Sequence, residues 1–314
     1  MLTPDSRGTR LLVYPEHNGL RLDQFLAAAT VLSRRAARSA IGAGEVARNG
    51  RPTRVQSREV GTADVVDVAR SPDDLGVPPR PDLPPLTVLH RDRWLVAVDK
   101  PAGVLSQPSS RADRDLALDQ LTALHLAVAD GVPPFLRLVH RLDRLTTGVV
   151  LFAGNPQATA PLARAWSERA VERRYLAVVE GRPDESSFVV DRPIGRDPGH
   201  RWRFRIADGG RDARTEVRVA APLDDDLCLV ECQLDTGRTH QVRVHLSHCG
   251  HPVVGDRLYG AARLDLAPRP LLHAAVLALP HPKSGDPLRL VAPLPDDMVA
   301  YVPDGVAATL DGAG

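Results

Sequence analysis

Lysine, cysteine and aromatic residues are scarce in this chain of 314 residues, and long apolar segments are absent. Only two lysines occur, Lys100 and Lys283, so arginine carries almost all of the positive charge. No segment approaches the roughly 20 apolar residues that a membrane span requires. The first residues, with Asp5, Arg7 and Arg10, lack the apolar core of a secretory signal. We therefore expect a soluble cytoplasmic protein with no membrane partner.

The three cysteines do not form a disulfide framework, which agrees with a reducing compartment. Cys228 and Cys232 are expected to be small core residues on one face of a strand. The length of the chain suits two domains, and its apolar content rests on alanine, valine and leucine.

Positive charge is concentrated near the N-terminus, although the whole chain has a net charge of only +1. Between residues 21 and 58, eight arginines stand against two acids, a local net charge of 8 − 2 = +6. Apolar positions at helical spacing predict a helix over 22–29, and Ser33 can cap a second helix over 34–41. An Asn-Gly turn at 49–50 follows a predicted strand, and 64–68 is a plausible closing strand.

This order of elements, with RLDQFL, SRRAARSAI, VARNG and ADVVDV in sequence, resembles the small αL RNA-binding module of ribosomal protein S-four and several RNA enzymes. The resemblance covers about fifty residues, with a core of about 20–69. It implies that four arginines contact phosphates, namely Arg34, Arg35, Arg38 and Arg51. Such contacts would add affinity for RNA but little selectivity for its sequence. The alternative is a small structural cap with a solvated arginine face.

Prolines crowd the segment that follows, RSPDDLGVPPRPDLPP over 70–85. Because proline removes backbone donors and favours extended conformations, this segment is predicted to be a semi-rigid linker. The predicted organisation is therefore an N-terminal module over 1–70, a linker over 71–85 and a second domain over 86–314.

A single carboxylate in the second domain stands at the entrance to a buried strand. In the stretch LVHRLDRLTTGVVLF (138–152), Asp143 lies between Arg141 and Arg144, and the turn leads into an apolar run. Neighbouring arginines favour an ionised aspartate, and a rigid strand can hold it in place. Taken alone, the pattern favours an ordinary surface turn with local ion pairs.

Patterning predicts strands at 86–90, 94–104 and 173–181 and helices at 116–128 and 161–168. Tyr175 would begin the strand at 173–181, where the alternative is an ordinary core aromatic. The stretch 234–256 holds four histidines and a cysteine, which invites a zinc hypothesis. Their spacings do not match the compact ligand pairs of zinc sites, and HExxH is absent, so a turn followed by a helix is favoured.

Together, these motifs resemble the RluA-type pseudouridine synthases of RNA. The resemblance rests on WLVAVDKPAGVLSQP (94–108), LVHRLDRLTTGVVLFA (138–153), RRYLAVVEG (173–181), TGRTHQVRVHLSHCGHPVVGD (236–256) and PLLHAAVLALPHP (270–282), in the order of that family. Leu145 and Thr147 depart slightly from the usual residues. The resemblance implies an α+β domain with a mixed, mostly antiparallel sheet and a central cleft.

It also implies isomerisation of uridine to pseudouridine in RNA, with no cofactor and no metal. Asp143 matches the essential aspartate, which either attacks C1′ or removes a proton at C2′. Arg238 matches the arginine that pairs with it, Tyr175 the tyrosine that stacks on the base, and Leu272 a leucine near that ring. The target uridine must leave its helix, and three residues are candidates for filling its place or holding phosphates: His140, Arg141 and Arg144.

The expected partner is RNA, with large-subunit ribosomal RNA favoured over transfer RNA and no obligate protein partner. Three other functions compete with this prediction. A pure RNA-binding protein would not need Asp143, a glycoside hydrolase would need a second carboxylate, and a zinc hydrolase would need a metal.

Overall fold

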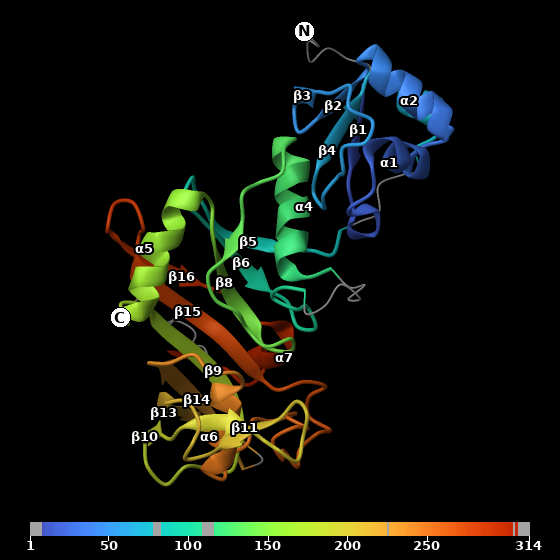
Figure 1. Ribbon diagram of the computed structural model, residues 1–314. Coiled ribbons are helices and arrows are strands. Elements are labelled where there is room, and N and C mark those ends of the chain that lie inside the picture. Colours follow the sequence, from blue (N-terminus) through green and yellow to red (C-terminus); the bar gives the residue numbers. More distant parts are fainter. Residues whose placement is uncertain (1–7, 78–82, 109–115, 225, 304, 307–314) are drawn as a thin grey trace. The chain divides into compact units, whose positions relative to one another are not determined.

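A computed structural model describes residues 8–77, 83–108, 116–224, 226–303 and 305–306 (Figure 1). The chain divides into two compact units, one comprising residues 1–86 and 107–136, the other residues 87–106 and 137–314. Asp5, Arg7 and the prolines at 78, 79 and 81 lie outside the described residues. No helix in the described part of the chain is long and apolar enough to cross a membrane.

The first unit is a small sheet covered by short helices, in the strand order β1-β4-β2-β3. Its elements are β1 (Thr9–Leu12), the 3-10 helix η1 (Pro15–His17), α1 (Leu22–Ala29), α2 (Arg34–Ala43), β2 (Val46–Arg48), β3 (Arg51–Pro52), β4 (Val65–Val68), α3 (Pro72–Leu75) and α4 (Leu118–Asp130). The predicted cap is confirmed, because the Ser33 hydroxyl accepts the Ala36 amide. Gly44 closes the same helix in the left-handed conformation.

Two helices of this unit lie where the sequence predicted a linker and the second domain. Helix α3 begins within the proline-rich segment, and its Leu75 is buried in the same cluster as Phe25 and Ile41. Helix α4 packs Leu124 and Ala127 against Leu12 and Val65. The segment 107–136 therefore belongs with the N-terminal unit, although local periodicity gave no sign of which unit its apolar face would join.

The second unit is built on a mixed sheet in the order β10-β13-β14-β9-β15-β8-β6-β5, with β16 paired to β15 and β7 paired to β8. Its elements are β5 (Thr87–Arg91), β6 (Leu95–Lys100), β7 (Arg137–Leu138), β8 (Thr147–Ala153), α5 (Pro156–Ser167), β9 (Glu172–Glu180), β10 (Ser187–Asp191), β11 (Ile194–Arg196), β12 (Phe204–Ile206), β13 (Arg214–Pro222), β14 (Leu227–Leu234), α6 (Gln241–His248), β15 (Leu272–Pro280), β16 (Pro287–Val291) and α7 (Asp296–Val299). Strands β15 and β8 pair in parallel, whereas the other pairings are antiparallel.

Parallel pairing at the centre of this sheet depends on one glycine. Gly148 has a φ of 114°, and a Cβ atom there would lie 2.2 Å from the carbonyl oxygen of Ala274 on the neighbouring strand. Only glycine permits this approach. The buried strand β8 therefore starts immediately after the turn that carries Asp143, as its continuous apolar run predicted. Cys228 and Cys232 are buried on β14, also as predicted.

Candidate active site

Asp143 lies in the turn between β7 and β8, and its two chain neighbours are held through their backbones. The Ser106 hydroxyl donates to the carbonyl of Leu142 and accepts that residue's amide, at 2.9 and 3.0 Å. On the other side, the Lys100 ammonium donates to the carbonyl of Arg144 at 3.0 Å. Because the residues on both sides of Asp143 have backbone groups with fixed partners, the carboxylate projects from a rigid turn.

Lys100 is fully buried, although lysine is seldom found without solvent. Its ammonium also donates to the carbonyls of Pro101 and Val104, at 2.9 and 2.7 Å, so that three acceptors use its three protons. Burial lowers the pKa of Lys100 to about 7, against the raising effect of the Asp143 charge. Sequence reasoning missed Lys100 and Ser106. The signal available was the rarity of lysine, which occurs at only two positions of this arginine-rich chain.

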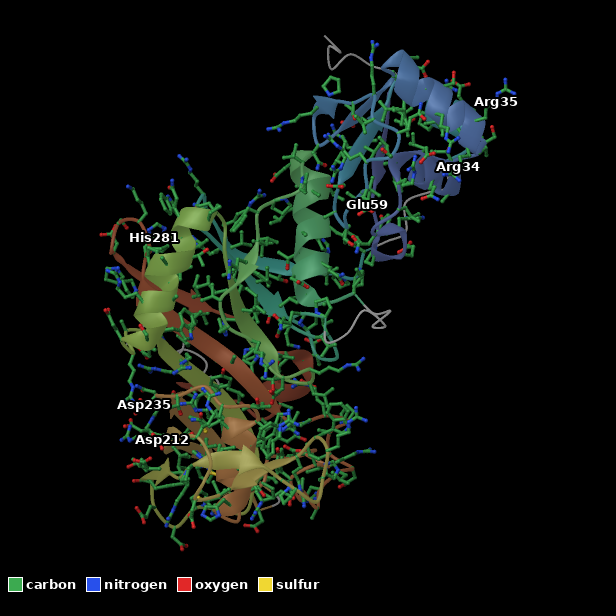
Figure 2. The ribbon with its side chains drawn as sticks, in the orientation of Figure 1. Arg34, Arg35, Glu59, Asp212, Asp235 and His281 are labelled. Carbon is green, nitrogen blue, oxygen red and sulfur yellow. The ribbon has the colours of Figure 1, made fainter. Side chains whose placement is uncertain are left out.

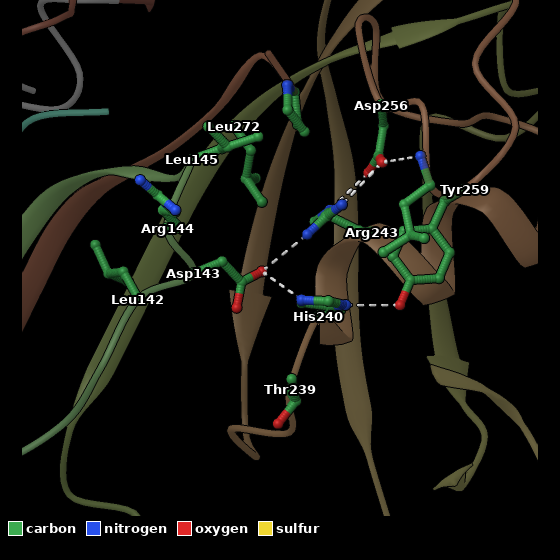
Figure 3. Close-up of polar contacts among 12 residues, drawn as sticks. Leu142, Asp143, Arg144, Leu145, Thr239, His240, Arg243, Asp256, Tyr259 and Leu272 are labelled. Atoms are coloured by element: carbon green, nitrogen blue, oxygen red, sulfur yellow. Dashed lines mark hydrogen bonds and ion pairs between the residues drawn. The ribbon is translucent and has the colours of Figure 1, made fainter. Parts of the chain in front are cut away.

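The Asp143 carboxylate faces Arg243 of helix α6 (Figure 3). Nη1 of Arg243 lies 3.3 Å from Oδ2 of Asp143. The remaining donors of this guanidinium bind Asp256, with Nε to Oδ2 at 2.6 Å and Nη2 to Oδ1 at 2.9 Å. Its plane lies over the Tyr259 ring, 4.9 Å from the ring centroid. Asp256 is fully buried, so a bidentate pair fixes the direction in which Arg243 points.

His240 is the second group directed at the carboxylate. Its Nε2 lies 3.9 Å from Oδ2 of Asp143, and its Nδ1 lies 2.7 Å from the Tyr259 hydroxyl. That hydroxyl oxygen accepts the amide of Phe204 at 3.0 Å, which leaves the phenolic proton for Nδ1. We assign the imidazole proton to Nε2, facing Asp143. Burial lowers the pKa of His240, which favours the neutral ring.

A cleft of about 600 Å³ opens over this carboxylate. Its walls include Arg141, Asp143, Tyr175, Arg238, His240 and Leu272. Tyr175 and Leu272 belong to one apolar cluster on the neighbouring strands β9 and β15. Burial raises the pKa of Tyr175 to about 12, so its phenol stays protonated. The cleft thus combines a carboxylate with an aromatic and aliphatic wall.

The predicted pairing of Arg238 with Asp143 is wrong. Arg238 lines the cleft, but its Nε donates to the backbone carbonyl of Asp212 at 2.8 Å. Arg238 stands in the turn before α6, whereas Arg243 is inside the helix between buried Val242 and Val244. Burying a guanidinium is costly unless its charge is paired. The VRV pattern was therefore the signal that could have identified Arg243.

His140 lines the cleft, but one of its ring nitrogens and one ring face are engaged by other residues. Its Nε2 accepts the amide of Leu151 at 3.2 Å, and its ring stacks on Trp166 with centroids 5.3 Å apart. Burial lowers its pKa to about 3, so the ring is neutral. Arg141 is exposed at the cleft and donates to the Thr239 hydroxyl at 3.3 Å. Arg144 donates to the carbonyl of Gly103 at 2.8 Å and is not among the lining residues.

Arginines of the first unit share one buried carboxylate. Arg34 and Arg38, with Arg21, donate to Asp23 at 2.7 to 3.2 Å. Burial acts to raise the pKa of Asp23, but these hydrogen bonds hold it well below its usual range. Three guanidinium groups on one carboxylate leave a positive surface. Arg35 and Arg51 are also exposed, and Figure 2 shows Arg34 and Arg35 on α2.

The histidines of α6 and its flanks have separate partners. His245 contacts the Thr215 hydroxyl and the carbonyl of Arg192, at 2.9 and 3.1 Å, while His251 contacts the carbonyl of Glu180 at 3.1 Å. Among the described residues, no group of three or more histidine, cysteine or acidic side chains could hold a metal ion.

Comparison with known proteins identifies the class of enzyme that shares this fold and site. Residues 94–248 match the family model for RNA pseudouridylate synthase, and residues 20–66 match that for the S4 domain. The human RNA pseudouridylate synthase domain containing 1 has a similar structure. It has a TM-score of 0.60 and 26% identity, over 74% of this chain and 97% of that one.

More similar sequences refine this class. An uncharacterized RNA pseudouridine synthase of Mycobacterium bovis is 39% identical over 292 residues, covering 89% of this chain and 92% of its own. Ribosomal large subunit pseudouridine synthase D of Nitrosomonas europaea is 42% identical over 226 residues, covering 69% and 64%. The chain belongs to the RluA-type RNA pseudouridine synthases, which are isomerases, and its N-terminal module is of the S-four type. The predicted fold class is confirmed.

Proposed function

We propose that this RNA pseudouridine synthase uses Asp143 as its catalytic carboxylate and acts on a uridine of large-subunit ribosomal RNA. The observation that supports the first part is the Asp143 carboxylate, oriented by Arg243 at the base of a cleft with Tyr175 and Leu272 on its wall. For the second part, the support is the large-subunit name of the relative from Nitrosomonas europaea.

In the proposed reaction, the bond from C1′ to N1 breaks, the base turns over, and C1′ bonds to C5. The proton on C5 leaves and N1 gains one, so the product is an isomer and no co-reactant is consumed. Asp143 either bonds to C1′ or takes the C2′ proton to form a glycal. Arg243 holds the carboxylate while its charge changes, and the neutral ring of His240 faces it with Nε2 3.9 Å from Oδ2.

Tyr175 and Leu272 form the proposed surface for the uracil ring. A tyrosine with a pKa of about 12 is a poor base at neutral pH, so we assign it stacking and hydrogen-bond donation. The target base must be extruded from its helix, which costs a few kcal/mol and favours loops and weak pairs.

Tritium release from RNA labelled at C5 of uridine tests the role of Asp143. We expect release by the wild type and none by Asp143→Asn. Asp235→Asn is the matched control, because Asp235 also lines the cleft but pairs with Arg214. Equal release by wild type and Asp143→Asn would remove Asp143 from the chemistry.

Mapping of pseudouridines in total RNA, from cells with and without the gene, tests the target. A site lost from large-subunit ribosomal RNA supports the proposal. A site lost only from transfer RNA would favour the alternative substrate. In both cases Asp143→Asn should fail to restore the site.

A further inference from the structure

A two-stranded hairpin beside helix α6 is rich in arginine. Strands β11 and β12 pair antiparallel, from Ile194 opposite Ile206 to Arg196 opposite Phe204. We call residues 194–206 the arginine hairpin. It contains four arginines and one aspartate, a net charge of 4 − 1 = +3 in a chain of net charge +1. These are Arg196, Arg201, Arg203, Arg205 and Asp197.

An exposed tryptophan stands at the tip of this hairpin. Trp202 is 64% exposed, whereas Trp94 and Trp166 pack against an apolar core cluster. The guanidinium carbon of Arg201 lies over the ring of Trp202, 4.7 Å from the ring centroid. A large aromatic side chain left in water keeps apolar surface available for a ligand. An aromatic face beside cationic groups is the surface on which bases of single-stranded nucleic acid stack.

Hydrogen bonds at the tip give the loop a defined shape. Arg203 donates to the Asp197 carboxylate at 2.6 Å, and the other carboxylate oxygen accepts the Gly199 amide at 2.9 Å. The Trp202 amide donates to Nδ1 of His200 at 3.2 Å. A preorganised loop loses less conformational entropy when it binds.

The base of the arginine hairpin forms part of the cleft. Ile194 and Phe204 line the cleft, and the Phe204 amide donates to the Tyr259 hydroxyl that orients His240. Figure 1 shows β11 beside α6. Trp202 is two residues from Phe204, so their Cα atoms lie at most about 7 Å apart. A strand that places one nucleotide in the cleft therefore passes close to Trp202.

We propose that the arginine hairpin binds the single-stranded RNA next to the target uridine, with Trp202 stacking on a neighbouring base and Arg201 and Arg205 contacting phosphates. This inference rests on the proposed function and extends it to the adjoining nucleotides. Extrusion of the uridine exposes neighbouring bases, and stacking on Trp202 replaces part of the stacking that they lose.

Tryptophan fluorescence with a 20-nucleotide oligouridylate tests the contact directly, in the Asp143→Asn background so that no chemistry intervenes. We expect RNA to quench the fluorescence, and Trp202→Phe to abolish most of the quenching while retaining most of the affinity. Trp202→Ser should weaken binding about 5- to 100-fold. Val189→Ser, which replaces another exposed apolar residue of the same unit, should bind normally.

Salt dependence tests the arginines. The double variant Arg201→Gln, Arg205→Gln should reduce the slope of log affinity against log salt by about 1.4, because each phosphate contact to a single strand contributes about 0.7. An unchanged slope would overturn the phosphate contacts.

Activity on a large-subunit ribosomal RNA transcript separates this inference from the proposed function. In the otherwise wild-type enzyme, Trp202→Ser should raise KM about 5- to 100-fold and leave kcat within about twofold. If the wild type is active and Trp202→Ser has an unchanged KM and RNA affinity, the hairpin inference is wrong. That result would be expected if the exposed surface bound a protein partner instead of RNA. If the wild type is inactive but RNA quenches Trp202, the proposed function fails and the hairpin inference stands.

Discussion

Replacing Asp256 by asparagine should impair catalysis although Asp256 lies behind Arg243 rather than in the cleft. The wild-type carboxylate receives two hydrogen bonds from the guanidinium, at 2.6 and 2.9 Å, and one from the Leu258 amide at 3.1 Å. An asparagine can accept from one guanidinium nitrogen but presents an NH₂ group to the other. One contact is lost and a repulsive contact replaces it.

The size of the effect follows from burial. Asp256 and Arg243 are both less than 10% exposed, so the pair lies in a low-dielectric site. Breaking such a pair costs about 3–5 kcal/mol of folding stability, because one charge stays buried without its partner. Arg243 is then free to turn from its position 3.3 Å from Asp143. A misplacement of about 1 Å can lower the rate about 100-fold.

Single-turnover tritium release with saturating RNA measures the chemical step, and thermal unfolding measures stability. We expect Asp256→Asn to lower the single-turnover rate about 100-fold and to lower Tm. Glu231→Gln is the control, since Glu231 is also buried and pairs with Arg218 and Arg174, and it is not among the cleft-lining residues. It should lower Tm and leave the rate unchanged. A full rate in Asp256→Asn at a temperature where it is folded would refute the argument that Asp256 positions Arg243.

Three further predictions follow from contacts around the site. Tyr259→Phe removes the hydroxyl that binds Nδ1 of His240, so kcat in steady-state tritium release should fall about 3- to 30-fold at constant KM. An unchanged kcat would contradict the assignment of the imidazole proton to Nε2. Burial lowers the pKa of His140 to about 3 and that of His273 to about 4, so below pH 6.5 the unfolded chain binds protons that the folded chain does not bind. In urea unfolding, the free energy of unfolding should therefore fall between about pH 6.5 and 4 by roughly 1.4 kcal/mol per pH unit for each histidine. His273→Asn should make this pH dependence less steep. Gly148→Ala should lower the free energy of unfolding by several kcal/mol, because the new methyl group would clash with the carbonyl oxygen of Ala274. A variant Tm equal to that of the wild type would disprove the parallel pairing of β8 and β15 at this position.

Local patterns in the sequence predicted several of the fold elements. The helix over 22–29 has the predicted bounds, and the helix from 34 extends two residues beyond its predicted end. Ser33 and the Asn-Gly turn act within a few residues of themselves, which is why spacing alone revealed them. The sequence did not show that the segment around helix α4 belongs to the first unit. Periodicity identifies an apolar face of a helix but not the surface against which that face will pack.

Family resemblance and sequence motifs placed Asp143, Tyr175 and Leu272 correctly around one cleft. They chose the wrong arginine. Arg238 and Arg243 are five residues apart in one motif, and only the path of helix α6 decides which guanidinium reaches the carboxylate. The neutral state of His140 is likewise set by the tertiary structure, through burial and the hydrogen bond from the Leu151 amide.

The sequence by itself determined the class of enzyme, the order of its elements and the carboxylate at the start of β8, because motifs and periodicity are properties of neighbouring residues. The tertiary structure decided how that carboxylate is held. Lys100, Ser106, Arg243 and Asp256 come from separate segments, and their partners are set by packing across the sheet rather than by spacing along the chain. Charge and hydrogen bonding act over a few ångströms, so these contacts are defined only once the chain has folded.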